Sequence, residues 1–179
     1  IQIHLLRKQP EVWINGTLAT FDPQTLKLLI ILADEGAPLY NREDLVTLLH
    51  GMDTPQTRET FRKRVLPPLR KILPEDTLRN LKHDLIQFQQ RDVFVDSRAF
   101  SEGAAKLTQS GRAFGEEECQ QAERILSQYH APFLGDFLSK LTDGAGRDFA
   151  ARQKTRRDEL ATRYHELLER VVEYLIKRT

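Results

Sequence analysis

The chain has 179 residues and a formal net charge of +1 at pH 7, with 40% hydrophobic and 30% charged residues. This composition is typical of a globular protein with enough apolar sequence for one large domain or two small ones. No apolar run approaches the roughly 20 residues that a membrane helix requires, and the first residues lack a secretion signal, so we expect a cytoplasmic protein without a membrane partner.

Several kinds of chemistry are not indicated by the sequence. The single cysteine, Cys119, cannot form an internal disulfide bond and stands among glutamates, with no basic neighbour that would favour its thiolate. The five histidines are scattered, and neither a Gly-rich phosphate loop nor a nucleophile elbow is present. We therefore expect no enzymatic activity, no cofactor and no metal. Because the chain begins at Ile1 instead of Met and ends within a helical pattern, we also expect it to be part of a longer protein.

The first third of the chain predicts a small antiparallel sheet followed by two short helices. Asn15-Gly16, between alternating apolar residues, is the strongest short-range hairpin signal. Asp22-Pro23 is a capped start for the first helix, which Gly36 ends. Asn41 caps the second helix, which Gly51 ends.

A third helix should begin at Thr54-Pro55, where the cap and the proline recur. Pro67 and Pro68 remove two backbone donors, so we expect this helix to end or kink there and its exposed part to span about residues 54–66. A hairpin over about residues 78–89 should follow, although its Lys82-His83-Asp84 tip contains no glycine, and residues 93–95 should be extended.

Basic residues are concentrated in this region. Residues 54–84 contain eight basic and four acidic residues, a balance of +4. At 100° per residue, the face opposite Phe61 is polar and basic. Such a face is often simply solvated. Two capped helices before it and a hairpin after it, however, are the order of a winged helix-turn-helix, whose third helix enters the major groove of double-stranded DNA.

On this hypothesis the third helix reads bases or anchors phosphates, and the hairpin acts as a wing on the backbone or the minor groove. The expected DNA contacts are Thr54, Gln56, Thr57, Arg58, Thr60, Arg62, Lys63 and Arg64 on the helix, and Arg79, Lys82 and His83 on the hairpin. The alternative is a protein-interaction module in which a winged-helix scaffold and a helical stack bind a partner protein.

From Asp96 onward only helical patterns occur, which predicts an all-helical domain with one long helix at its end. The fold class is therefore α+β: a winged helix-turn-helix with an N-terminal β-hairpin sheet over residues 1–95, then an all-α, TPR-like domain over residues 96–179. A second group of basic residues opens the last helix, and we interpret it as a solvated face: Arg147, Arg152, Lys154, Arg156 and Arg157.

The order of several motifs resembles the antibiotic-regulatory-protein (SARP) type of bacterial transcriptional regulator. The similar segments are residues 41–45 (NREDL), 57–61 (TRETF), 69–73 (LRKIL), 95–100 (VDSRAF), Tyr129 with 135–138 (GDFL), and Phe149 followed by 152–160 (RQKTRRDEL), an aromatic residue before a charged helix. The resemblance implies a winged helix-turn-helix joined to a bacterial transcriptional activator domain. It also implies a homodimer on direct repeats near promoters, and contact of the helical domain with a second protomer or RNA polymerase.

Overall fold

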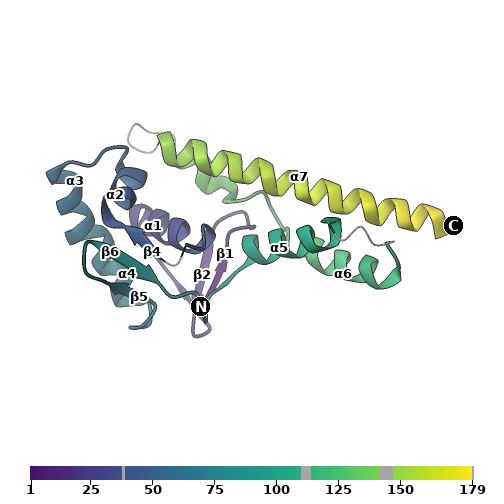
Figure 1. The fold of residues 1–179 in the computed structure, drawn as a ribbon, viewed down its shortest axis with the longest axis horizontal. Helices are drawn as coiled ribbons and strands as arrows, with labels where there is room; N and C mark the ends of the chain where they lie inside the picture. The colour runs from purple at the N-terminus through teal and green to yellow at the C-terminus, as the bar shows by residue number, and fades with distance from the viewer. Residues whose placement is uncertain (38, 110–113, 142–146, 179) are drawn as a thin grey trace.

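The structure, a computed structural model, describes residues 1–37, 39–109, 114–141 and 147–178. The fold is mixed α+β, with two small sheets and several helices (Figure 1). Within the described residues, no helix is long and apolar enough to cross a membrane.

The first sheet contains four strands in the order β3-β2-β1-β7. The strands β1 (Gln2–His4), β2 (Glu11–Ile14) and β3 (Thr17–Ala19) are antiparallel, and β7 (Phe94–Val95) pairs parallel with β1. Asn15 and Gly16 have positive φ angles of 50° and 79°, as a tight hairpin turn requires, so the predicted first hairpin is confirmed.

The first two helices, α1 (Pro23–Asp34) and α2 (Arg42–His50), begin where the caps predict. The Asp22 carboxylate accepts hydrogen bonds from the N–H groups of Gln24 and Thr25, and the Asn41 side chain accepts from the N–H of Glu43. Between the helices lies a strand that the sequence did not predict, β4 (Leu39–Asn41).

Strand β4 joins a second sheet of order β4-β6-β5, in which β5 (Leu78–Asn80) and β6 (Leu85–Phe88) form the predicted second hairpin. His83 and Asp84 at its tip adopt left-handed φ angles of 59° and 57°. Histidine and aspartate tolerate this conformation better than most residues, so the turn forms without glycine.

The third helix is longer than expected. It comprises α3 (Pro55–Thr60), a π-helical segment η1 (Phe61–Val65) and α4 (Leu66–Ile72). Of the two expected outcomes at the prolines, an end or a kink, the end is wrong. The helical backbone continues through a wider, irregular turn in which the N–H of Leu66 donates to the carbonyl of Phe61. The prolines at 67 and 68 then occupy the first turn of α4 and contribute no N–H donors there.

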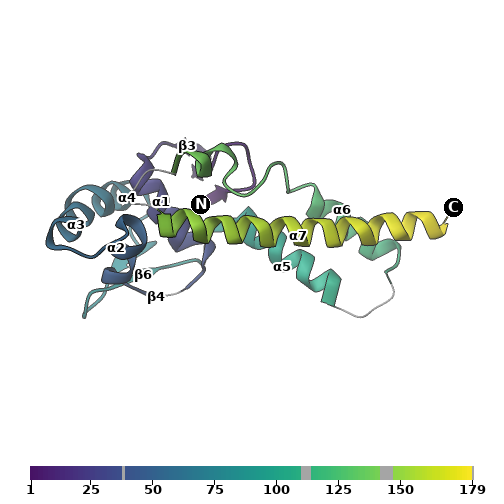
Figure 2. The same ribbon diagram turned by 90° about the horizontal axis from the view of Figure 1, so that it is seen from above.

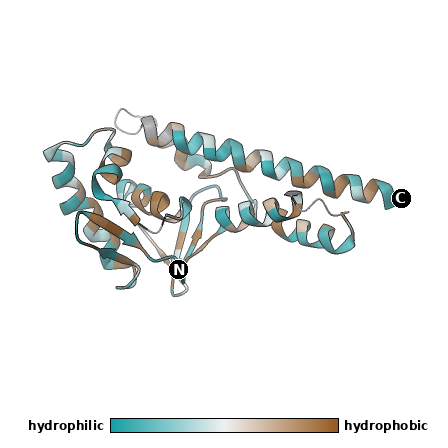
Figure 3. Ribbon diagram, viewed as in Figure 1, coloured by the Kyte–Doolittle hydropathy of each residue, from teal (hydrophilic) through white to brown (hydrophobic). Residues whose placement is uncertain are grey.

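The remaining regular elements of the described residues are helices, as expected after residue 95. They form α5 (Asp96–Gln109), α6 (Glu116–Leu126), a 3₁₀ segment η2 (Gly135–Leu141) and the 32-residue α7 (Arg147–Arg178). Helix α7 packs along α5 and α6 and reaches back over α1 and α2 (Figures 1 and 2). The ribbon of α7 is mostly hydrophilic (Figure 3), and the apolar residues of α1 are buried.

One hydrophobic core joins residues 1–95 with the helical part. Its largest buried side chains include Phe61 and Phe88 before the junction, and Phe100, Phe133 and Phe149 after it. At the junction, the buried Asp96 carboxylate accepts hydrogen bonds from the N–H groups of Leu5 and Leu6 at 2.7 and 3.2 Å. The two predicted domains are thus packed against each other over a continuous apolar interior.

The basic group at the start of α7 also belongs to this contact. Arg156 and Arg152 lie 3.1 and 3.2 Å from the carboxylates of Asp34 and Glu35 at the end of α1. Arg157 donates to the backbone carbonyls of Phe133 and Gly135. The interpretation of this group as a solvated face is therefore wrong for Arg156 and Arg157, which are partly buried, whereas Arg152 remains exposed although it pairs with Glu35. Lys154 is exposed as expected, and the Arg147 side chain lies outside what the structure describes.

Candidate nucleic-acid interface

Helix α3 and the segment η1 lie at the end of the molecule opposite the C-terminal end of α7 (Figures 1 and 2). Phe61 and Val65 in η1 are buried and fix this segment to the core, whereas Arg62, Lys63 and Arg64 are exposed. The periodicity placed Lys63 on the outward face and Arg62 on its flank, and both are exposed; Arg64, which it placed closer to the buried edge, is exposed as well. The helical part does not cover them.

Two of the expected contact residues are used by the helix start itself. The Thr57 hydroxyl oxygen accepts a hydrogen bond from the N–H of Thr54 at 2.8 Å, and the Thr54 hydroxyl oxygen accepts from the N–H of Thr57 at 3.1 Å. This reciprocal capping box stabilises the first turn of α3. Of the remaining uncharged candidates, Gln56 is exposed and Thr60 is half-buried.

Arg58 is held by carboxylates from neighbouring segments. Its Nε donates to Asp53 at 2.7 Å, and its guanidinium lies 2.9 Å from Glu43 on α2. The hydrogen bond from Arg58 holds the pKa of the Asp53 carboxyl below its ordinary value, so the carboxylate stays ionised. Arg58 therefore ties α2 to α3 and carries a charge that is already compensated.

Two more of the expected cations are paired. Lys63 Nζ lies 2.6 Å from Glu59 Oε1, and Arg79 forms an ion pair with Asp76. The hydrogen bond and positive charge of Lys63 lower the pKa of Glu59, which is thus an ionised carboxylate. These pairs are exposed, so each contributes little to stability.

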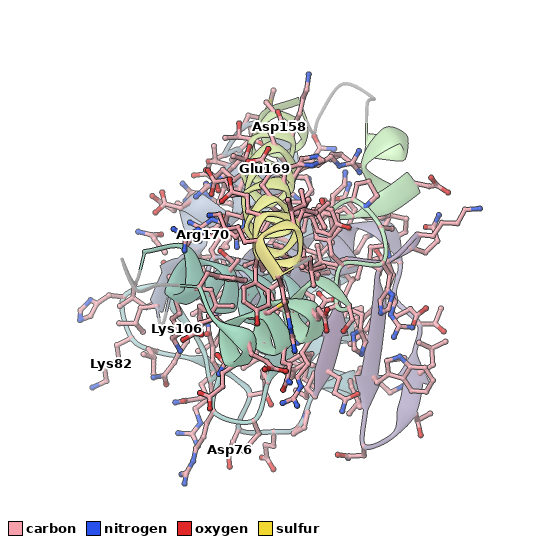
Figure 4. All side chains as sticks on the ribbon, turned by 90° about the vertical axis from the view of Figure 1, so that its right-hand side faces the viewer. Asp76, Lys82, Lys106, Asp158, Glu169 and Arg170 are labelled. Atoms are coloured by element: carbon pink, nitrogen blue, oxygen red, sulfur yellow. The ribbon has the colours of Figure 1, made fainter. Side chains whose placement is uncertain are left out.

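The tip of the second hairpin is fixed to the start of α2. The N–H of Arg42 donates to the Asp84 carbonyl at 2.9 Å, and its guanidinium donates to the Asp84 carboxylate at 2.8 Å. Lys82 projects into solvent beside this tip (Figure 4), and His83 is also exposed. The hairpin therefore keeps a defined position relative to α3.

Some cations of this surface are not compensated by an ion pair. In the part of the chain that the structure describes, Arg62, Arg64 and Lys82 form none. Arg62 borders a cleft of about 370 Å³ between α2, α3 and the hairpin tip, whose lining alternates in charge: Arg42, Glu43, Val46, Pro55, Arg58, Glu59, Arg62 and Asp84.

This surface can bind a polyanion through several cations on rigid elements, and it presents both hydrogen-bond donors and acceptors. Among the described residues, no group of His, Cys, Asp and Glu side chains could hold a metal ion. The sequence placed Glu59 on this face but did not indicate it as a contact residue, although its opposite charge four positions before Lys63 was a local signal. Sequence reasoning missed Arg42 and Glu43, which are brought close only by the packing of α2.

Neither a protein-family model nor a curated protein matches this chain.

Proposed function

We propose that this chain is a sequence-specific DNA-binding transcription regulator. In this proposal residues 1–95 form a winged helix-turn-helix, the helix that begins at Pro55 enters the major groove, and the hairpin β5–β6 is the wing. The observation that carries the proposal is the exposure of Arg62, Lys63 and Arg64 beside the buried anchors Phe61 and Val65. A helix fixed to the core by one face and basic on the other is suited to a groove lined by phosphates.

The order of elements supports the same function. Helices α1 and α2, the third helix and then a hairpin follow one another with short connections. The Arg42–Asp84 contact holds the hairpin beside the third helix, so both could contact one duplex. Recognition of this kind requires no chemical step, so the proposal includes neither enzymatic activity nor a cofactor.

The helical part is proposed as the activator and oligomerisation domain. Between α5 and α7 lies a groove of about 980 Å³ whose lining includes Asp158, Glu159, Glu166, Glu169 and Glu173. Helix α7 with Asp158, Glu169 and Arg170 is seen end-on in Figure 4. This acidic surface would repel DNA, so the proposed homodimer and RNA polymerase contacts belong to this half. The acidic groove between α5 and α7 is also the observation that favours the alternative function, a module that binds a partner protein.

Titration with salt separates the two functions. Binding of duplex DNA should weaken by about 0.9 decades per decade of salt for each phosphate neutralised. We expect a steep dependence, and enrichment of particular duplexes when the protein selects from a random pool. Absence of DNA binding at low salt, together with saturable binding of a protein partner, would favour the interaction module.

A further inference from the structure

Glu59 and Lys63 form an exposed ion pair on the outer face of the third helix. The Glu59 Oε1 and Lys63 Nζ atoms are 2.6 Å apart, and both side chains are more than half exposed. Lys63 is the one residue with which Glu59 forms an ion pair in the described ranges. Neither side chain is needed to hold the core together, so both are available to a ligand.

The neighbouring polar side chains are less available. Thr54 and Thr57 cap the helix, and Arg58 is bound by Asp53 and Glu43. Base contacts come from the N-terminal turns of a helix that lies in the major groove. On this helix, Glu59 lies about one turn beyond the cap and Lys63 about one turn further, and both side chains are exposed.

A carboxylate at this place has a specific consequence for binding. Facing phosphates, it weakens affinity for every sequence unless it accepts a hydrogen bond from a base. An ionised carboxylate can only accept, and the donors in the major groove are the amino groups of cytosine N4 and adenine N6. The N7 acceptor of adenine lies next to its amino group and repels a carboxylate, so cytosine is the better partner.

We infer that the Glu59–Lys63 pair reads one C·G base pair, with Glu59 accepting from cytosine N4 and Lys63 donating to O6 and N7 of the paired guanine. The inference rests on the proposed function and names the base pair that this helix recognises. The geometry supports it because cytosine N4 and guanine O6 are hydrogen-bonded neighbours in the base pair, as the carboxylate and the ammonium are on the helix.

The test uses the full chain and its Glu59→Gln variant. Both proteins select from a pool of random duplexes, and their affinities are then measured for duplexes that differ at one position. We expect the wild-type chain to enrich a C·G pair that Glu59→Gln replaces with A·T, because glutamine bonds to adenine N6 and N7 together. The ratio of affinities for the C·G and A·T duplexes should fall by about tenfold or more.

Glu117→Gln on α6 is the matched control. Glu117 is also exposed, and the variant changes the net charge by the same amount at a position outside the third helix. It should keep the wild-type base preference. Selection of the same duplexes by Glu59→Gln and wild type, even with uniformly tighter binding, would overturn the inference and leave DNA binding intact. Failure of the wild-type chain to bind or enrich any duplex would overturn the proposed function as well.

Discussion

Asp34 and Arg156 are 122 positions apart in sequence, yet the Arg156 Nε donates to the Asp34 carboxylate at 3.1 Å. The same carboxylate accepts a hydrogen bond from Ser97 at 2.5 Å and is 7% exposed. One nearly buried acid at the end of α1 therefore binds the start of α5 and the start of α7, and connects residues 1–95 to both helices.

Asp34→Ala should destabilise the protein through this contact. The substitution leaves Arg156 and Ser97 without their common partner in a poorly solvated place, which for a fully buried pair costs about 3–5 kcal/mol. Because the Arg156 side chain keeps some exposure, we expect a loss of about 2–3 kcal/mol in the free energy of unfolding, measured by urea denaturation. Glu159→Ala removes the exposed partner of Arg156 and should cost less than about 1 kcal/mol. Equal losses in the two variants would contradict this assignment.

His50 at the end of α2 should make stability depend on pH. Burial, aided by the charge of Lys27, lowers the pKa of His50 below its ordinary value of 6.5. The unfolded chain therefore takes up a proton at a higher pH than the folded chain, and stability is lost as the pH falls below 6.5 toward the folded pKa. This contribution is at most about 1.4 kcal/mol per pH unit. His50→Gln should give a shallower decline in the free energy of unfolding between pH 6.5 and 5; parallel curves would exclude this role.

Local signals in the sequence were sufficient for some elements. Asp22, Asn41 and Thr54 cap their helices through backbone groups two or three residues away, so their effect can be predicted from the adjoining sequence. Strand β4 could not be predicted in this way. Its three residues show no extended alternation and become a strand only by pairing with β6, more than forty positions later.

The same distinction applies to the candidate interface. The helical periodicity indicated that Lys63 and Arg62 face outward, because the burial of Phe61 and Val65 fixes the rotation of the helix, but it placed the exposed Arg64 too close to the buried edge. It could not indicate which charges are compensated. The carboxylates that hold Arg58 come from α2 and from the loop before α3, and only tertiary packing brings Glu43 close to it.

Thr54→Ala should affect folding more than recognition. Its hydroxyl oxygen caps the first turn of α3, so removal should cost about 1 kcal/mol in the free energy of unfolding. Thr54→Ser keeps the capping oxygen and should retain most of the stability. Since neither variant changes charge, the salt dependence of DNA binding should remain as in the wild-type chain. Loss of DNA affinity in Thr54→Ala without loss of stability would instead make Thr54 a contact residue.

His83→Gly should stabilise the chain. His83 has a φ angle of 59°, a conformation that costs an L-residue about 1–2 kcal/mol and glycine almost nothing. After the greater flexibility of glycine in the unfolded chain is subtracted, we expect a gain of about 0.5–1 kcal/mol in urea denaturation. Asp84→Gly should show no such gain, because it also loses the hydrogen bond with Arg42. A destabilised His83→Gly variant would show that the histidine side chain stabilises the turn.

Arg62→Ala and Lys63→Ala should weaken DNA binding without unfolding the protein. Both side chains are exposed, so the free energy of unfolding should change by less than about 0.5 kcal/mol. Where the side chain reads a base pair, the binding free energy should weaken by about 1–3 kcal/mol. Where it neutralises a phosphate, the slope of log affinity against log salt concentration should become shallower by about 0.9. Lys106→Ala, which removes an exposed cation of α5, is the control and should keep the wild-type affinity. Unchanged affinity of both variants at matched salt would show that DNA does not bind this helix.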